Sequence, residues 1–127
     1  MKSNSENSYS SDLLAKTANS GEMIILSERK SNNANNAEEL IRSIELRGIE
    51  HIFFVPGKLI YPLINAIDAS KIRGIVCSHE TSSGFMADGY SRASRKFGVC
   101  LAISGPGTMN LVPAMAAAQA DRIPVLY

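Results

Sequence analysis

The segment IEHIFFVPG, residues 49–57, is the clearest indication of architecture in this chain. Residues 49–55 are apolar nearly throughout, which is the pattern of a parallel strand covered on both faces. Pro56 and Gly57 then interrupt the run, because both residue types break regular structure. The segment therefore predicts a buried parallel strand that ends in a tight turn.

A helix is predicted just upstream of this strand, over residues 37–47. Asn36 is placed to cap its first turn, and Glu39 stands at the third helical position, as in a capping box. Gly48 supplies the left-handed residue that ends the helix. The apolar face predicted from helical spacing consists of Leu40, Ile41 and Ile44.

Downstream, strand-like and helical segments continue to alternate. The predicted helices cover residues 59–69, 81–94 and 109–120, and the predicted strands cover residues 72–77, 98–104 and 123–127. This order calls for right-handed crossovers and predicts an α/β fold, a three-layer, doubly wound parallel sheet with helices on both faces. Because the chain stops inside the last strand, we expect a sheet that is incomplete at the C-terminus and a chain that is a fragment.

The predicted helix over residues 81–94 contains bulky apolar residues and two glycines. Gly84 and Gly89 are expected to let another backbone approach closely. The side chains expected to pack in the core, because they recur at helical spacing, are Phe85, Met86 and Tyr90.

The N-terminal part of the chain has a different composition. Residues 1–36 are rich in Ser and Asn and hold one short apolar run, at residues 23–26, which is too little to close a core. We expect a flexible extension there, followed by a partial domain over residues 37–127. Residues 1–20 lack the apolar stretch of a signal peptide, so the cytoplasm is the expected location.

Composition narrows the classes of function. The 13 basic and 12 acidic residues are interspersed, and no basic stripe with aromatic residues indicates a nucleic-acid binder. The apolar runs are far shorter than the ~20 residues of a membrane-spanning helix. Cys77 and Cys100 lie in strand-like runs without CxxC spacing, so both are expected to be small buried residues rather than metal ligands.

Glu80 is the acidic residue best placed for chemistry, because it follows the predicted strand at residues 72–77 and precedes a helix. Ligands of open parallel sheets bind outside the carboxyl ends of the strands, which is where this acid lies. An acid in the first turn of a helix is also stabilised by the helix dipole, and residue type and position alone favour this ordinary role. A zinc motif HExxH starting at His79 is excluded, since Ser83 occupies the second ligand position.

The loop GPGTMN, residues 105–110, follows a predicted strand and opens a helix, as a dinucleotide-binding loop does. Asn110 departs from that motif, because it stands where the third glycine is required. Two other interpretations stay open: a plain tight turn, and a loop that presents backbone N–H groups and Asn110 to a ligand.

Several segments occur in a recognisable order. They are EELIRSIELRGIEHIFFVPG (residues 38–57), SHETSSGFMADGYSR (78–92), SGPGTMN (104–110) and DRIPV (121–125). Together they resemble the N-terminal pyrimidine-binding domain of thiamine-diphosphate-dependent enzymes, within the acetolactate synthase and 2-oxo acid decarboxylase group. Motifs that share order and spacing are far more specific than any one of them.

The resemblance implies that Glu80 is the catalytic glutamate, which hydrogen-bonds the ring nitrogen N1′ of the cofactor's aminopyrimidine. Proton sharing with N1′ favours the imino tautomer, whose nitrogen removes the thiazolium C2 proton. Desolvation in an apolar pocket is expected to favour this sharing over a fixed carboxylate charge. Lys58 departs from the family's Pro-Gly-Gly turn, on the substrate side. The cofactor-binding residues implied besides Glu80 are Pro56, Gly57, Pro106 and Asn110.

The resemblance also implies cofactors and partners. In the family a separate domain with a GDG motif holds the diphosphate and Mg²⁺, and the site forms between subunits of an oligomer. The implied substrate is a 2-oxo acid, and FAD is a further family cofactor that no residue here indicates. The leading interpretation is a half-site domain that is inactive alone. The alternatives are a split-enzyme or non-catalytic subunit that completes the site of a diphosphate-binding partner, and a dinucleotide-binding module.

Overall fold

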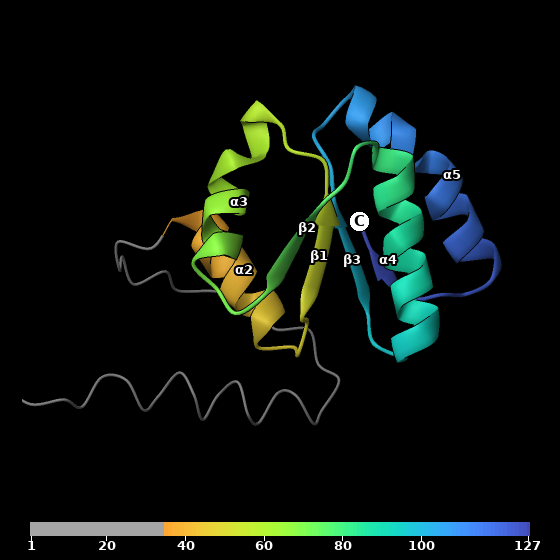
Figure 1. Ribbon diagram of the computed structural model, residues 1–127, viewed down its shortest axis with the longest axis horizontal. Coiled ribbons are helices and arrows are strands. Elements are labelled where there is room, and N and C mark those ends of the chain that lie inside the picture. The colour runs from red at the N-terminus through yellow and green to blue at the C-terminus, as the bar shows by residue number, and fades with distance from the viewer. Residues whose placement is uncertain (1–34) are drawn as a thin grey trace, which may run out of the picture. The chain divides into compact units, whose positions relative to one another are not determined.

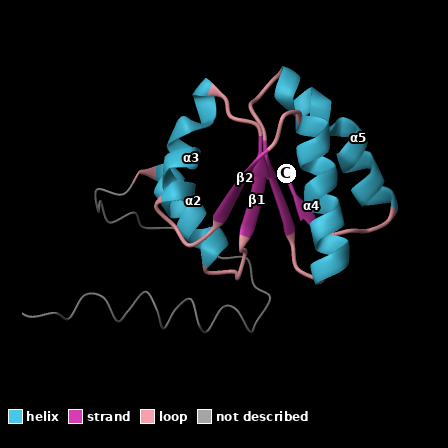
Figure 2. Ribbon diagram, viewed as in Figure 1, coloured by secondary structure: helices cyan, strands magenta, loops and turns pink. Residues whose placement is uncertain are grey.

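The strands in the described part of the chain form one parallel sheet, ordered β2-β1-β3-β4, with helices on both faces (Figure 1). The computed structural model describes residues 35–127. The predicted α/β, doubly wound fold class is confirmed. The helices are α2 (Asn36–Glu45), α3 (Tyr61–Asp68), α4 (Glu80–Ser94) and α5 (Pro106–Ala120), with a 3₁₀ turn η1 (Lys58–Ile60). The strands are β1 (His51–Phe54), β2 (Arg73–Val76), β3 (Gly98–Leu101) and β4 (Val125–Leu126) (Figure 2).

The predicted flexible extension over residues 1–36 lies outside the described residues, except for residues 35 and 36. The apolar run at residues 23–26 also lies outside them, so the extension and the boundary at residue 37 stay predictions. Within residues 35–127, no helix combines the length and the apolar character that crossing a membrane requires.

β1 is a central strand whose alternating side chains reach both layers of the core. Ile52 and Phe54 pack in the cluster formed with α2 and α3, whereas Phe53 packs in the cluster formed with α4 and α5. All three side chains are buried. Burial on both faces of the sheet is the reason why this segment is apolar at successive positions.

The helices that follow the two central strands lie on opposite faces of the sheet. α3 follows β1 and packs in the first cluster through Ile67, whereas α5 follows β3 and packs in the second through Leu111. Figure 1 shows α2 and α3 on one side of the sheet and α4 and α5 on the other. The winding therefore reverses between β1 and β3, and in doubly wound folds a ligand site lies outside the strand ends at such a reversal.

Asn35, rather than Asn36, caps α2, which corrects the prediction by one residue. The Asn35 side-chain oxygen accepts hydrogen bonds from the N–H groups of Ala37 and Glu38, each at 3.0 Å. Its amide donates to the Glu38 carboxylate at 3.1 Å. Glu38 is therefore the acidic residue of this cap, a role that was predicted for Glu39.

Leu40 does not belong to the buried face of α2, which is a second correction. Ile41 is buried and Ile44 packs beside it, whereas Leu40 is 50% exposed. Neighbouring residues are turned by about 100° around a helix, and this turn carries Leu40 to the solvent side. Gly48 has a φ of 76°, as expected for the residue that ends the helix.

α4 packs closely against α5 at Gly84. A Cβ at Gly84 would lie only 2.6 Å from the Ala114 Cβ, so the predicted close approach is confirmed there. The same prediction is wrong for Gly89, where a Cβ would meet nothing within 4 Å. The two glycines therefore have different roles in one helix.

The apolar residues of α4 are divided between the core and the surface. Tyr90 is half-buried and lies with its ring centroid 6.0 Å from that of Phe53, as a core residue should. Phe85 and Met86 are each 44% exposed, so the prediction that they pack in the core is wrong. Helical spacing identified the helix, but the close contact with α5 is made at Gly84.

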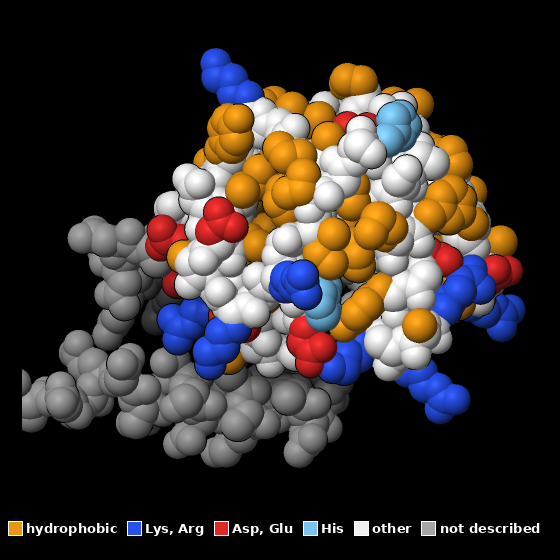
Figure 3. Space-filling view, in the orientation of Figure 1, with side chains coloured by type: hydrophobic (Ala, Val, Ile, Leu, Met, Phe, Trp, Pro, Cys, Tyr) orange, Lys and Arg blue, Asp and Glu red, His pale blue; other side chains and the backbone are white. Residues whose placement is uncertain are grey.

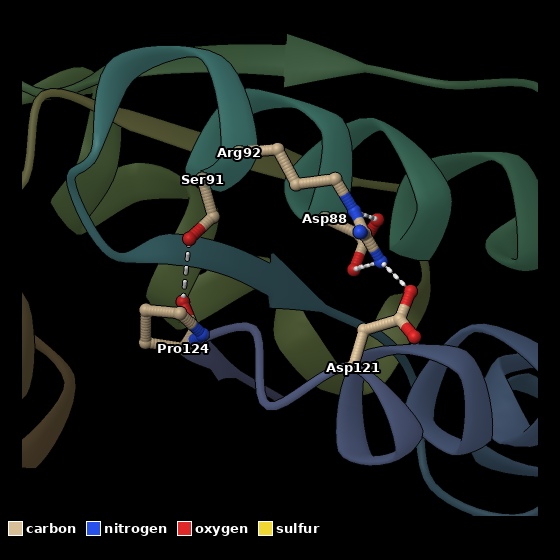
Figure 4. A network of polar contacts seen from close by, with 5 residues as sticks. All are labelled: Asp88, Ser91, Arg92, Asp121 and Pro124. Atoms are coloured by element: carbon tan, nitrogen blue, oxygen red, sulfur yellow. Dashed lines mark hydrogen bonds and ion pairs between the residues drawn. The ribbon is translucent and has the colours of Figure 1, made fainter.

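A polar network joins the ends of α4 and α5 (Figure 4). The Arg92 guanidinium donates to the buried Asp88 carboxylate at 2.6 Å and to the Asp121 carboxylate at 2.7 Å. The Ser91 hydroxyl donates to the Pro124 carbonyl at 3.0 Å. These contacts attach the segment that leads into β4 to the end of α4.

Candidate functional site

Glu80 follows the carboxyl end of β2, as the sequence predicted, and it is the first residue of α4, one residue before the predicted start of this helix. His79 caps the helix, because its Nδ1 accepts a hydrogen bond from the Thr81 N–H at 3.2 Å. This is the ordinary structural role for His79. Since the cap fixes the backbone at the start of α4, the direction in which Glu80 leaves the helix is fixed as well.

α5 begins at Pro106 rather than at residue 109, which corrects the predicted start of this helix and shortens the predicted loop. Gly105 precedes it with a φ of 79°, a conformation that favours glycine. The Met109 N–H donates to the Gly105 carbonyl at 3.0 Å and closes the first turn. Proline fits the first helical position, where no N–H donor is needed. Asn110 therefore projects from a helix rather than from a loop.

Asn110 and Glu80 are in direct contact, although they are far apart in the sequence. The Asn110 Nδ2 donates a hydrogen bond to the Glu80 Oε2 at 3.0 Å. The Thr81 hydroxyl donates to the Asn110 carbonyl at 2.5 Å, so side chains bind in both directions between the two helices. The N-terminal parts of α4 and α5 are thereby held together at the carboxyl ends of the strands.

Ile103, which follows β3, packs between the segment that follows β1 and the start of α5. A Cβ at Gly57 would lie 3.1 Å from the Ile103 Cδ1, and a Cβ at Gly107 would lie 2.7 Å from the Ile103 Cγ2. The Gly107 position is also next to the acid, because its Cβ would lie 3.3 Å from the Glu80 Oε1. The residues after β1, β2 and β3 thus converge at the winding reversal.

The pKa of Glu80 is lowered from its ordinary value, chiefly by the hydrogen bond from Asn110. Hydrogen bonding to its own backbone N–H and the charge of His79 act in the same direction, while partial burial acts against them. Glu80 is half-buried. In this chain by itself burial does disfavour the charge, but hydrogen bonding to the ionised form outweighs it. The expectation of proton sharing in a desolvated pocket around the cofactor stays a prediction.

Of the predicted site residues, Glu80 and Asn110 are in direct contact, and Gly57 is linked to them through Ile103 and Gly107. Pro56 is an exposed residue that follows β1, and Pro106 is the exposed first residue of α5. Their contact with a cofactor stays a prediction.

Three residues of this site were not predicted: Thr81, Ile103 and Gly107. Thr81 and Gly107 lie inside the motifs HET and GPG, which was the available signal. Ile103 carried none, because an isoleucine near the end of a strand has the appearance of an ordinary core residue.

Apolar side chains are exposed on the two helices that carry the site (Figure 3). On α4 and α5 the exposed large ones are Phe85, Met86, Met109, Val112 and Met115. Among residues 35–127, no three His, Cys, Asp or Glu side chains gather in a way that could hold a metal ion. What the described residues offer is one carboxylate, its amide partner and apolar surroundings.

Comparisons with known proteins agree on the kind of domain that this fold and site form. Residues 34–127 match the family "Thiamine pyrophosphate enzyme, N-terminal TPP binding domain". An acetolactate synthase of Mycobacterium avium is 46% identical over 91 residues, which is 71% of this chain and 15% of that protein. A probable 2-ketoarginine decarboxylase of Pseudomonas aeruginosa is 40% identical over 89 residues, 70% of this chain and 16% of that protein.

The acetolactate synthase isozyme 2 large subunit of Escherichia coli is 37% identical over 92 residues, 72% of this chain and 17% of that protein. The chain thus spans about a sixth of the length of these relatives. It belongs to the family of N-terminal thiamine-pyrophosphate-binding domains of thiamine pyrophosphate enzymes.

Proposed function

We propose that this chain binds the aminopyrimidine half of thiamine diphosphate, with Glu80 as the carboxylate that exchanges a proton with ring nitrogen N1′. The observation that carries the proposal is the Glu80–Asn110 hydrogen bond at the winding reversal. It places a single half-buried carboxylate at the strand ends, where this fold binds ligands.

The residues present fit such a ring. The Asn110 amide donates a hydrogen bond to the Glu80 Oε2, while Oε1 lies beside Gly107. A Cβ at position 107 would lie 3.3 Å from that oxygen. A glycine at position 107 therefore keeps side-chain atoms away from the acid. A glutamate is ordinarily ionised at neutral pH, and the lowered pKa of Glu80 keeps it so, which makes it a hydrogen-bond acceptor for a protonated ring nitrogen.

The bound cofactor supplies the reacting carbon and the electron sink for chemistry beside a 2-oxo acid carbonyl. The chain's own part is narrower. Glu80 holds or releases one proton at its carboxylate, and the capped helix α4 fixes where that carboxylate lies. Gly107 adjoins the carboxylate, and Gly57 lies against Ile103, which also packs at Gly107. Pro56 and Pro106 border the ring in this proposal.

The whole enzyme is proposed to be acetolactate synthase-like or 2-oxo acid decarboxylase-like, and to act in the cytoplasm as a homo-oligomer. Both activities appear among the relatives' names. A separate domain or subunit would hold the diphosphate and Mg²⁺. Because a catalytic site requires both halves, this chain alone should show no turnover of 2-oxo acids in the presence of thiamine diphosphate and Mg²⁺.

Binding is tested by titrating the ¹⁵N-labelled chain with thiamine diphosphate and following backbone amide shifts. A half-site has few contacts, so we expect a Kd of about 1 mM or weaker. Amides of Gly57, Glu80 and Gly107 should shift, whereas those of Glu50 and Lys96, near the opposite strand ends, should not.

A matched pair of variants sharpens this experiment. Glu80→Gln should weaken binding, and Glu50→Gln should leave it unchanged, because Glu50 forms an exposed ion pair with Lys96. No shift at the site amides, or shifts with NAD and none with thiamine diphosphate, would refute the proposal. The second result would favour the dinucleotide-binding alternative.

A further inference from the structure

The environment of Glu80 is asymmetric between its two carboxylate oxygens. Oε2 accepts the hydrogen bond from the Asn110 amide at 3.0 Å, whereas Oε1 lies beside Gly107, where a Cβ would come within 3.3 Å of this oxygen. A carboxylate can exchange a proton with a ring nitrogen through one oxygen at a time. The amide of Asn110 therefore distinguishes the two oxygens before any ligand is bound.

Asn110 is itself held in place from several directions. It lies in α5, whose first turn is closed by the bond from the Met109 N–H to the Gly105 carbonyl. Its own carbonyl accepts the hydroxyl of Thr81, the residue that follows Glu80. Because the backbone of Asn110 is fixed by the helix and by this cross-helix bond, only its side-chain torsions remain to be ordered when its amide binds Glu80.

We propose that Asn110 is a positioning residue for Glu80. Its amide holds Oε2 in a hydrogen bond, so that Oε1 is the oxygen that faces the pyrimidine. The inference rests on the proposed function for the identity of the ring, but not for the effect on the carboxylate. Asn110 does not transfer a proton in this account. It acts through Glu80, by fixing the orientation of the carboxylate and by stabilising its ionised form.

This assignment differs from a merely structural role, in which Asn110 would only join α4 to α5. A structural role would change the stability of the fold and leave the titration of Glu80 alone. A positioning role changes the titration itself, because loss of a hydrogen bond to the ionised form raises the pKa of a carboxyl group.

The test is a ¹³C NMR titration of the Glu80 carboxyl in the full chain without cofactor, with Glu80→Gln used to assign its resonance. In Asn110→Ala the pKa of Glu80 should rise toward that of an ordinary glutamate. Asn65→Ala, an exposed asparagine on α3, is the matched control and should leave the titration unchanged. An unchanged Glu80 titration in folded Asn110→Ala would overturn the proposal.

Asn110→Asp is the second variant, because it keeps the shape of the side chain and decides the question if the alanine variant does not fold. It replaces the donor with a second carboxylate, so the pair should titrate with a raised apparent pKa. A Glu80 titration in this variant like that of the native chain would also contradict the proposal.

The holoenzyme provides the readout that links Asn110 to chemistry. In Asn110→Ala the rate of C2 proton exchange should fall by about 10- to 100-fold, the range for a misplaced reacting group. The acid limb of its pH profile should move to higher pH. If Glu80 titrates as predicted but thiamine diphosphate does not bind, the proposed function fails while the role of Asn110 toward Glu80 stands. If the cofactor binds and the Glu80 titration is unaffected, only the present inference fails.

Discussion

Gly84 on α4 lies directly against Ala114 on α5, so closely that a Cβ at Gly84 would come within 2.6 Å of the Ala114 Cβ. Each residue lies one helical turn beyond a member of the candidate site, since Gly84 follows Glu80 by four residues and Ala114 follows Asn110 by four. Residues four apart share a helix face. The close packing at Gly84 therefore sets the separation at which Glu80 and Asn110 meet.

Replacing Gly84 with alanine should destabilise the protein, whereas the same change at Gly89 should stabilise it. Overpacking against Ala114 costs about 1–3 kcal/mol. At Gly89 the new methyl group meets nothing, and removing a helical glycine contributes about 0.5–1 kcal/mol. Urea unfolding measures both changes, and equal effects of the two variants would contradict the packing described here.

Gly84→Ala should also lengthen the contact between Glu80 and Asn110, because the helices must move apart to admit the methyl group. The Glu80 carboxyl resonance reports this change. We expect it to titrate at higher pH in Gly84→Ala than in Gly89→Ala.

Arg92→Met should destabilise the protein more than Lys96→Met does. Arg92 is the ion-pair partner of Asp88, whose side chain is 8% exposed, and leaving a buried carboxylate without its partner costs about 1–3 kcal/mol. Lys96 pairs with Glu50 at the exposed surface, and such pairs contribute little. Thermal unfolding of the two variants compares the pairs, and a larger loss in Lys96→Met would contradict this interpretation.

Cys77 should react with iodoacetamide well before Cys100 in the folded protein. Burial raises the pKa of the Cys100 thiol to about 11, and its Sγ lies 3.0 Å from the Ser83 hydroxyl. Cys77 is only half-buried, which departs from its predicted full burial. Mass spectrometry at pH 8 should find the label on Cys77, and on both thiols in denaturant. Early labelling of Cys100 would contradict its burial in the folded protein.

Acid should destabilise the native protein more steeply than it destabilises Glu80→Gln. A carboxyl whose pKa is lower in the folded state contributes stability that is full above its unfolded pKa, about 4.3 for glutamate. That contribution is lost as the pH falls through the lower folded pKa. Urea unfolding at a series of pH values measures the difference, and parallel pH dependences in the two proteins would contradict a lowered pKa.

The order of the helices and strands was predictable from the sequence, because each element has a pattern among neighbouring residues that indicates it. The apolar segment around Phe53 and the left-handed Gly48 each specify one conformation from neighbouring residues alone. The start of α5 was misjudged because Pro106 and Gly107 are strong turn formers, although proline also suits a first helical position. The cap of α2 was misplaced by one residue because Asn35 and Asn36 are equivalent as sequence, and only the structure distinguishes them.

The sequence identified most residues of the candidate site, but it did not predict which of them are in contact. Glu80 and Asn110 were singled out separately, and nothing local indicates that a side chain on one helix binds the other. Their contact depends on the packing of Gly84 against Ala114, which is a tertiary property. For the same reason the lowered pKa of Glu80 was not foreseen, since its main cause is Asn110.

Glu80 is proposed to exchange a proton with the cofactor's pyrimidine. The most direct test of this role is C2 hydrogen–deuterium exchange of thiamine diphosphate in the assembled holoenzyme. Glu80→Gln keeps the size of the side chain but removes its acid–base function, so exchange should slow by about 10²- to 10⁴-fold. Glu50→Gln, whose carboxylate pairs with Lys96 away from the site, should exchange at the native rate. Exchange at the native rate in Glu80→Gln would contradict the account.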